Sequence, residues 1–245
     1  PVQLNLTESR WYQILHGLCY LHFITGNRSL ACNVPPEIRT VYNSLVTDGL
    51  IQRKKHYDQL HLYAEAAANL YGVISQDDFV ALFNSQNEDI TSKEELFDAL
   101  IRHIVVDAGY CFWDKYIVDI GFEDNGFADV SDLLAQIGDK PRYIPEKKEF
   151  LKYADWRYFE HNEHSRNLGD YLIHVCGVAP LLVPKIVTEL HESCMLSESF
   201  QNRFDLLAEH GIEFDGDQLN EFIQLLSAFD NSTRLWSNNG HSPNE

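Results

Sequence analysis

Four histidine and cysteine side chains in the C-terminal half have the types and spacing of metal ligands. His191 and Cys194 are three positions apart, so they would share one face of a helix. His161 and His164 have the same spacing and could join them in space. Zinc needs four such ligands, or three ligands and a water molecule. These four residues are therefore the candidate ligands of a metal-dependent hydrolase, and the alternative is that they are ordinary surface and core residues of a helical bundle.

A second group of this kind lies near the N-terminus. His16, Cys19 and His22 follow one another at intervals of three residues. The first two can share a helix face, but the third moves away from it. We interpret them as partly buried residues of an amphipathic helix.

The catalytic motifs that we sought are incomplete. The segment that starts at His191 begins like the zinc-protease motif HExxH, but Met195 stands where the second histidine is required. The inverted motif fails at Glu160, which replaces its first histidine. Neither a phosphate-binding loop ending in Gly-Lys-Ser/Thr nor a GxSxG nucleophile elbow occurs. The sequence therefore favours a non-enzymatic protein over the metal hydrolase.

Charge is distributed unevenly along the chain. The net charge is −18, which repels nucleic-acid phosphate over most of the surface. Residues 1–55 nevertheless hold six Lys or Arg against three Asp or Glu, a net charge of +3. This excess ends in Arg53, Lys54 and Lys55. These three residues are the candidate nucleic-acid contact, and the alternative is a solvated helix end beside an acidic body.

Hydrophobic periodicity predicts a mainly α protein in three parts. Residues 1–57 read as an N-terminal helical arm with helices at 8–24 and 37–55. Residues 58–145 read as three short helices and a β-hairpin whose strands, 110–113 and 116–119, flank an Asp-Lys turn. Residues 146–245 read as a helical bundle with a polar tail. We expect Ser75 to cap the helix that follows it, and Ser92 or Thr91 to form a capping box with Glu95 or Glu94.

Three helices followed by a hairpin is the element order of a winged helix. In that arrangement the third helix usually enters the major groove of DNA. Here the third helix begins at about residue 92 and is net negative, with carboxylates at its start. We therefore expect a winged helix that contacts protein rather than DNA, or no winged helix at all.

Cysteine usage and hydropathy indicate the compartment. The five cysteines are widely spaced and form no CxxC pair, which is typical of a reducing cytoplasm. No apolar run approaches the ~20 residues needed to span a bilayer, and the N-terminus does not read as a signal peptide. We expect a cytoplasmic protein with no membrane partner.

Residues 231–245 carry a family resemblance. Their sequence, NSTRLWSNNGHSPNE, resembles the segment that precedes the zinc knuckle in bacterial SEC-C-motif proteins of Firmicutes type, and residues 69–75, NLYGVIS, resemble the middle region of such proteins. The resemblance implies an interaction role and a Cys-rich knuckle that binds zinc after the tail. No cysteine follows in this chain, so we expect no cofactor here and zinc only in a longer natural chain, of which this would be a truncated form.

One tail residue is a candidate contact in its own right. Trp236 is a large apolar side chain in a polar segment, and such surface is normally buried. We expect it to pack back onto the last helix, with contact to a partner as the alternative. The leading hypothesis is a non-enzymatic interaction protein with a protein partner. Nucleic-acid binding and a metal-dependent hydrolase are the alternatives.

Overall fold

The computed structural model describes residues 25–26, 32–45 and 47–245. The chain divides into two compact units, residues 1–56 and residues 57–245. In the first unit, β1 (Thr25–Gly26) pairs antiparallel with β2 (Cys32–Asn33), and α2 (Pro36–Leu45) follows. No residue of α2 is buried. The expected helix at 8–24, with His16, Cys19 and His22, lies outside the described residues.

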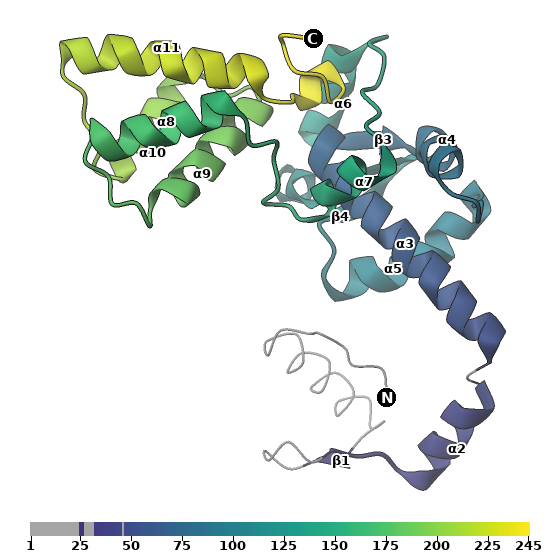
Figure 1. The fold of residues 1–245 in the computed structure, drawn as a ribbon. Coiled ribbons are helices and arrows are strands. Elements are labelled where there is room, and N and C mark those ends of the chain that lie inside the picture. Colours follow the sequence, from purple (N-terminus) through teal and green to yellow (C-terminus); the bar gives the residue numbers. More distant parts are fainter. Residues whose placement is uncertain (1–24, 27–31, 46) are drawn as a thin grey trace. The chain divides into compact units, whose positions relative to one another are not determined.

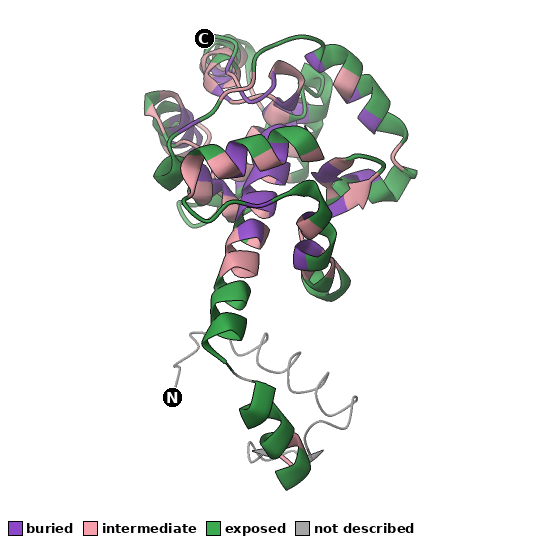
Figure 2. Cartoon of the chain, turned by 90° about the vertical axis from the view of Figure 1, so that its right-hand side faces the viewer, coloured by how far each residue is buried: buried purple, intermediate pink, exposed green. Residues whose placement is uncertain are grey.

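Helix α3 (Asp48–Tyr71) corrects one prediction. The sequence suggested a helix at 37–55 and another from 58, but α3 runs without a break across those residues. No glycine or proline occurs between residues 50 and 71, so nothing there ends a helix. The interruption lies earlier, where the hydroxyl of Thr47 accepts a hydrogen bond from the backbone N–H of Leu50 at 3.2 Å. Exposed residues dominate the beginning of α3 and buried ones its end (Figure 2).

The second unit begins with the winged-helix-like segment. Its elements follow in the order α3, β3 (Val73–Ser75), α4 (Gln76–Gln86), α5 (Lys93–Asp107), β4 (Tyr110–Trp113) and β5 (Tyr116–Asp119). The predicted hairpin of β4 and β5 is confirmed, and Trp113 pairs with Tyr116 beside the turn. The strand β3 adds a third member, giving an antiparallel sheet in the order β3-β5-β4. The winged-helix-like arrangement predicted from the sequence is therefore present, with a fuller sheet.

The helix starts in this segment were partly predictable. Ser75 caps α4 as expected, because its hydroxyl accepts the N–H of Asp78 at 3.0 Å. Ser92 precedes α5 but forms no side-chain cap bond, so the predicted capping box is absent. Instead, the hydroxyl of Thr91 donates to the carboxylate of Glu95 at 3.0 Å.

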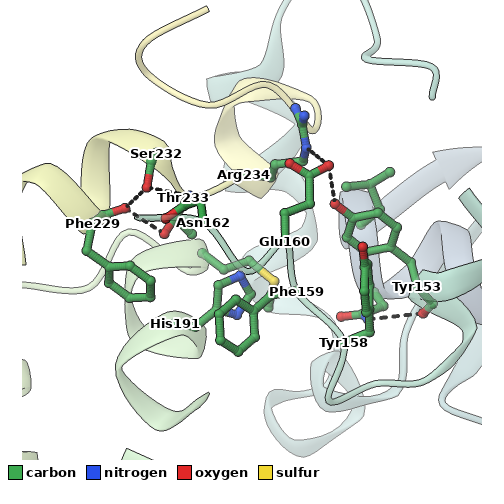
Figure 3. A pocket seen from close by; sticks show the side chains of 13 residues that line it. Tyr153, Tyr158, Phe159, Glu160, Asn162, His191, Phe229, Ser232, Thr233 and Arg234 are labelled. Atoms are coloured by element: carbon green, nitrogen blue, oxygen red, sulfur yellow. Dashed lines mark hydrogen bonds and ion pairs between the residues drawn. The ribbon is translucent and has the colours of Figure 1, made fainter. Parts of the chain in front are cut away.

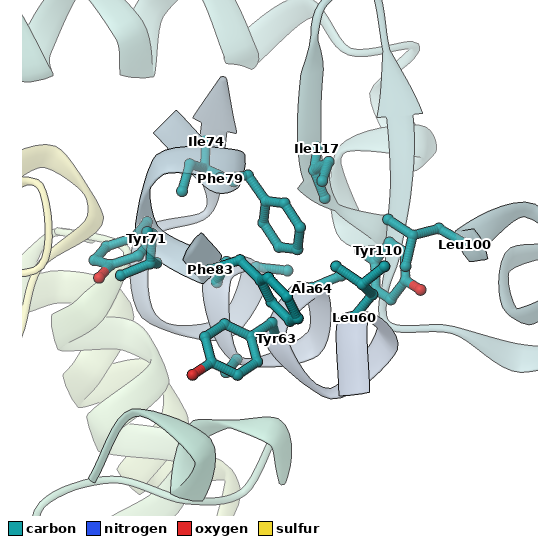
Figure 4. Packing of buried hydrophobic residues seen from close by; sticks show 14 of the residues in the cluster. Leu60, Tyr63, Ala64, Tyr71, Ile74, Phe79, Phe83, Leu100, Tyr110 and Ile117 are labelled. Carbon is teal, nitrogen blue, oxygen red and sulfur yellow. The ribbon is translucent and has the colours of Figure 1, made fainter. Parts of the chain in front are cut away.

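The small sheet separates two apolar clusters. Alternate strand residues point to opposite faces. One face, with Ile74, Tyr110 and Ile117, packs on α3, α4 and α5 (Figure 4). The other face carries Val73 and Val118, which pack against the 3-10 helix η1 (Ile120–Asn125) and α6 (Ala128–Ile137). Both faces of this small sheet are therefore covered by other elements of the chain.

A helical bundle forms the C-terminal part, as predicted. After α7 (Lys147–Phe150) and the 3-10 helix η2 (Leu151–Ala154) come the four helices of the bundle. They are α8 (Glu163–His174), α9 (Val183–Met195), α10 (Phe200–Glu209) and α11 (Gly216–Ser232), and α8 packs against both α9 and α11 (Figure 1). Their buried side chains form a cluster of their own. In the described part of the chain, no helix combines the length and apolar character needed to cross a membrane.

The C-terminal segment, residues 233–245, returns to the winged-helix-like segment. Its 3-10 helix η3 (Trp236–Asn238) contacts α6. Trp236 joins the cluster on the far side of the sheet, where its ring lies 5.7 Å from that of Phe122. We expected Trp236 to pack on α11, and this was wrong. The chain turns away after Thr233, whose backbone is extended, and this carries the ring to η1 and α6 instead.

Candidate protein-contact surface

Helix α5 is apolar on two faces. Leu96, Ala99 and Leu100 are buried in the core beneath it. On the outer side, Phe97 is 58% exposed and Val105 is 77% exposed. Phe97, Ile101 and Val105 follow at intervals of four residues, which places them along one stripe of the helix. Ile101 is half-buried and lies between the exposed Phe97 and Val105 in this stripe.

Strand β4 extends this stripe. The ring of Phe112 is half-buried and stacks on the ring of Phe97, with centroids 5.9 Å apart and planes inclined by 30°. Offset stacking of this kind is a favourable aromatic geometry. We call Phe97, Ile101, Val105 and Phe112 the α5–β4 surface. It joins the third helix and the hairpin, the two parts of a winged helix that contact DNA in DNA-binding members.

Carboxylates surround the α5–β4 surface. Glu94, Asp98 and Asp107 are exposed on α5. A hydrogen bond from the side chain of Ser92 lowers the pKa of Glu94, so this group is ionised at neutral pH. The result is an apolar stripe with a negative border.

The two long basic side chains of α5 are already paired with carboxylates. The ammonium of Lys93 lies 3.0 Å from Asp77, and the guanidinium of Arg102 lies 2.9 Å from Asp58. Helices that bind in the major groove of DNA need unpaired Lys or Arg side chains to contact phosphates and guanine bases. The basic side chains of α5 are therefore engaged with carboxylates.

The predicted basic residues lie elsewhere. Arg53, Lys54 and Lys55 belong to the first compact unit, whereas α5 belongs to the second. All three side chains are exposed on the first half of α3.

The four predicted metal ligands do not gather around one point. His161 and His191 both contact the ring of Phe159, at centroid distances of 4.3 and 4.4 Å. Cys194 is fully buried, and burial, together with the nearby charge of Asp230, raises the pKa of its thiol. His164 is partly exposed and lies beside Glu163.

Residues 25–26, 32–45 and 47–245 contain no group of three or more His, Cys, Asp or Glu that could hold a metal ion. The structure therefore does not support the metal site predicted from the spacing. His161 and His191 instead both pack against the aromatic ring of Phe159.

His191 should make the protein sensitive to acid. Burial, and then the charge of His161, lower the pKa of His191 to about 3. The folded state holds this imidazole neutral, whereas the unfolded chain takes up a proton below its pKa of about 6.5. The free energy of unfolding therefore decreases as the pH falls below about 6.5. The loss is at most about 1.4 kcal/mol per pH unit.

We expect denaturant unfolding at pH 7 and pH 5 to show a smaller pH effect in His191→Gln than in the wild type. The partly exposed His164→Gln is the control, and an unchanged pH effect in His191→Gln would contradict this account.

A small cavity lies next to His191 (Figure 3). Its volume is about 10 Å³, which suffices for one water molecule. Glu160 forms one wall, accepts a hydrogen bond from Tyr153 at 3.1 Å and pairs with Arg234 at 2.9 Å. A cavity of this size holds no substrate, so we assign it to packing.

The sequence did not single out the α5–β4 surface. Phe97, Ile101 and Val105 are not among the candidate residues that the sequence motifs indicate. The signal was present, because apolar residues at every fourth position, beside the buried Leu96 and Leu100, give the helix more apolar surface than one core contact requires.

Comparison with known proteins adds no relative. Neither a protein-family model, nor a curated protein, nor a solved structure matches this chain.

Proposed function

We propose that this chain is a non-enzymatic interaction protein that binds a partner protein through the α5–β4 surface. The observation that carries the proposal is the exposure of Phe97 and Val105 at the position where a winged helix meets its ligand. Aromatic side chains whose neighbours exclude water on binding are typical of the centres of protein interfaces.

The chemistry of the surface defines the partner. Its apolar stripe would bury apolar side chains of the partner, and Glu94, Asp98 and Asp107 would face Lys or Arg around them. The net charge of −18 would also speed association with a basic partner and repel acidic ones. A basic, amphipathic segment of another protein is the occupant that these features support.

Nucleic-acid binding is the second candidate. It is favoured by the exposed run of Arg53, Lys54 and Lys55 and by the winged-helix-like order. Two results would support nucleic-acid binding. The protein would bind nucleic acid at low salt, with an affinity that falls steeply as the salt concentration rises, and replacement of all three residues by Ala would abolish this binding.

The family and compartment also remain proposals. The resemblance to SEC-C-motif proteins supports a bacterial, cytoplasmic interaction protein, and zinc in a knuckle of a longer natural chain. Residues 69–75 and 231–245, which carry the resemblance, contact each other. The indole N–H of Trp236 donates to the carbonyl oxygen of Asn69 at 2.9 Å. This contact gives both segments a shared structural role.

Co-purification from cells that make the natural chain tests the proposal. We expect Phe97→Asp to lose the partner, because it places a charge in the centre of the interface. Phe200→Asp is the matched control, since Phe200 is 42% exposed on α10, outside the α5–β4 surface. Both variants should keep the wild-type melting temperature within a few degrees. Retention of the same partner by Phe97→Asp would overturn the proposal.

A further inference from the structure

A cavity of about 410 Å³ lies between α6, the end of α9 and η3. Its volume falls in the range of small-ligand sites, roughly 300–1,000 Å³. The proposed protein-contact surface shares no residue with it. Its lining has buried apolar residues at the floor and exposed acidic residues at the rim.

The floor of this cavity is apolar. Phe122, Leu133 and Trp236 line it and are each less than a tenth exposed. Met195 and Leu196 complete the apolar part. Two aromatic rings in the lining can attract a cation through their faces, and the aliphatic side chains can cover an alkyl stem.

The rim is acidic. Asp129, Asp132 and Glu198 line the cavity and are exposed. Asp129 accepts a hydrogen bond from Asn125, and Glu198 accepts one from Ser193 at 2.8 Å. Among the described residues, Asp132 has neither a hydrogen-bond nor an ion-pair partner.

One basic group approaches this cavity. The ammonium of Lys140 donates to the backbone carbonyl of Ser237, which lines the cavity, at 2.7 Å. Lys140 itself lines a different cavity. The lining thus holds three carboxylates, and the nearby ammonium of Lys140 is already bonded, so the local field is negative.

We propose that this cavity binds a guanidinium or ammonium group carried on an aliphatic stem, the chemistry of an arginine or lysine side chain. The stem lies on Leu133, Met195 and Leu196, and the cation lies between the aromatic rings and the carboxylates of the rim. Asp132 is the principal anionic contact because its carboxylate has no other bond to break.

Titration of the isotope-labelled full chain with Nα-acetyl-arginine amide, followed by amide NMR shifts, tests this proposal. We expect shifts at residues 129–136 and 195–198 that saturate in the millimolar range. Nα-acetyl-citrulline amide, which has nearly the same shape without the charge, should bind at least about fivefold more weakly. Asp132→Asn should weaken the arginine probe by about threefold to fivefold. Asp170→Asn removes an equal, exposed charge on α8 and should leave the affinity unchanged.

Two further probes distinguish the source of the cation. Tighter binding of the peptide Ala-Ala-Arg-Ala-Ala than of agmatine would assign the site to a protein partner, and the reverse would assign it to a free amine; either supports the proposal. Absence of shifts at about 20 mM arginine probe, equal binding of the citrulline probe, or equal weakening by both Asn variants would overturn it.

Discussion

Trp236→Ala is expected to destabilise the protein by about 3–5 kcal/mol, the range for removing a buried aromatic ring. The ring is only 8% exposed and fills the cluster formed by the sheet, η1 and α6. Its indole N–H also satisfies the carbonyl of Asn69, in the last turn of α3, where carbonyls lack partners within the helix. A domain is stable by about 5–15 kcal/mol, so this loss is a large share of the total.

Trp156→Ala provides the comparison for that measurement. Trp156 is 63% exposed in the loop before α8, and the guanidinium of the neighbouring Arg157 lies 4.9 Å from the centre of its ring. Its removal should change the free energy of unfolding by less than about 1 kcal/mol. Denaturant unfolding of both variants measures the difference, and an equal effect of the two substitutions would show that Trp236 is not held as described.

Gly72→Ala is expected to cost about 2–4 kcal/mol through the same contact, from backbone strain and overpacking together. Gly72 has a φ of +69°, a conformation that L side chains rarely adopt, and it follows the last residue of α3. A Cβ atom there would lie 2.4 Å from the ring of Trp236. The ring would have to move out of its cluster, and the hydrogen bond to Asn69 would weaken.

Gly126→Ala separates the two parts of this cost. Gly126 has a φ of +65°, but a Cβ atom there would meet nothing within 4 Å. It should therefore show the backbone strain alone, about 1 kcal/mol. The difference between the melting temperatures of the two variants measures the cost of the steric clash with Trp236. If Gly126→Ala were as destabilising as Gly72→Ala, the close approach of Trp236 would not be the cause.

Local signals in the sequence predicted much of the fold. The alternating β-branched and aromatic residues at 110–119 predicted the hairpin, and Ser75 predicted the start of α4. The strand β3 escaped notice because Val73, Ile74 and Ser75 are too few to show a period. They become a strand only because β5 supplies hydrogen-bond partners.

The functional features depended on tertiary packing. The spacing of His161, His164, His191 and Cys194 suited a metal, but spacing does not fix which side chains meet, and Phe159 contacts both His161 and His191. The cavity beside Trp236 is built from α6, α9 and η3, which are distant in sequence. Neither periodicity nor a motif could have placed these residues together.

The most direct test of the proposed function is photo-crosslinking from the α5–β4 surface. A photoreactive phenylalanine, p-benzoylphenylalanine, would replace Phe97 in the natural chain within its own cells, and Phe200 in a parallel strain. We predict a discrete adduct with a basic partner protein from position 97 and no such adduct from position 200. Failure of position 97 to yield an adduct, or the same adducts from both positions, would contradict the conclusion that α5 and β4 form the contact surface.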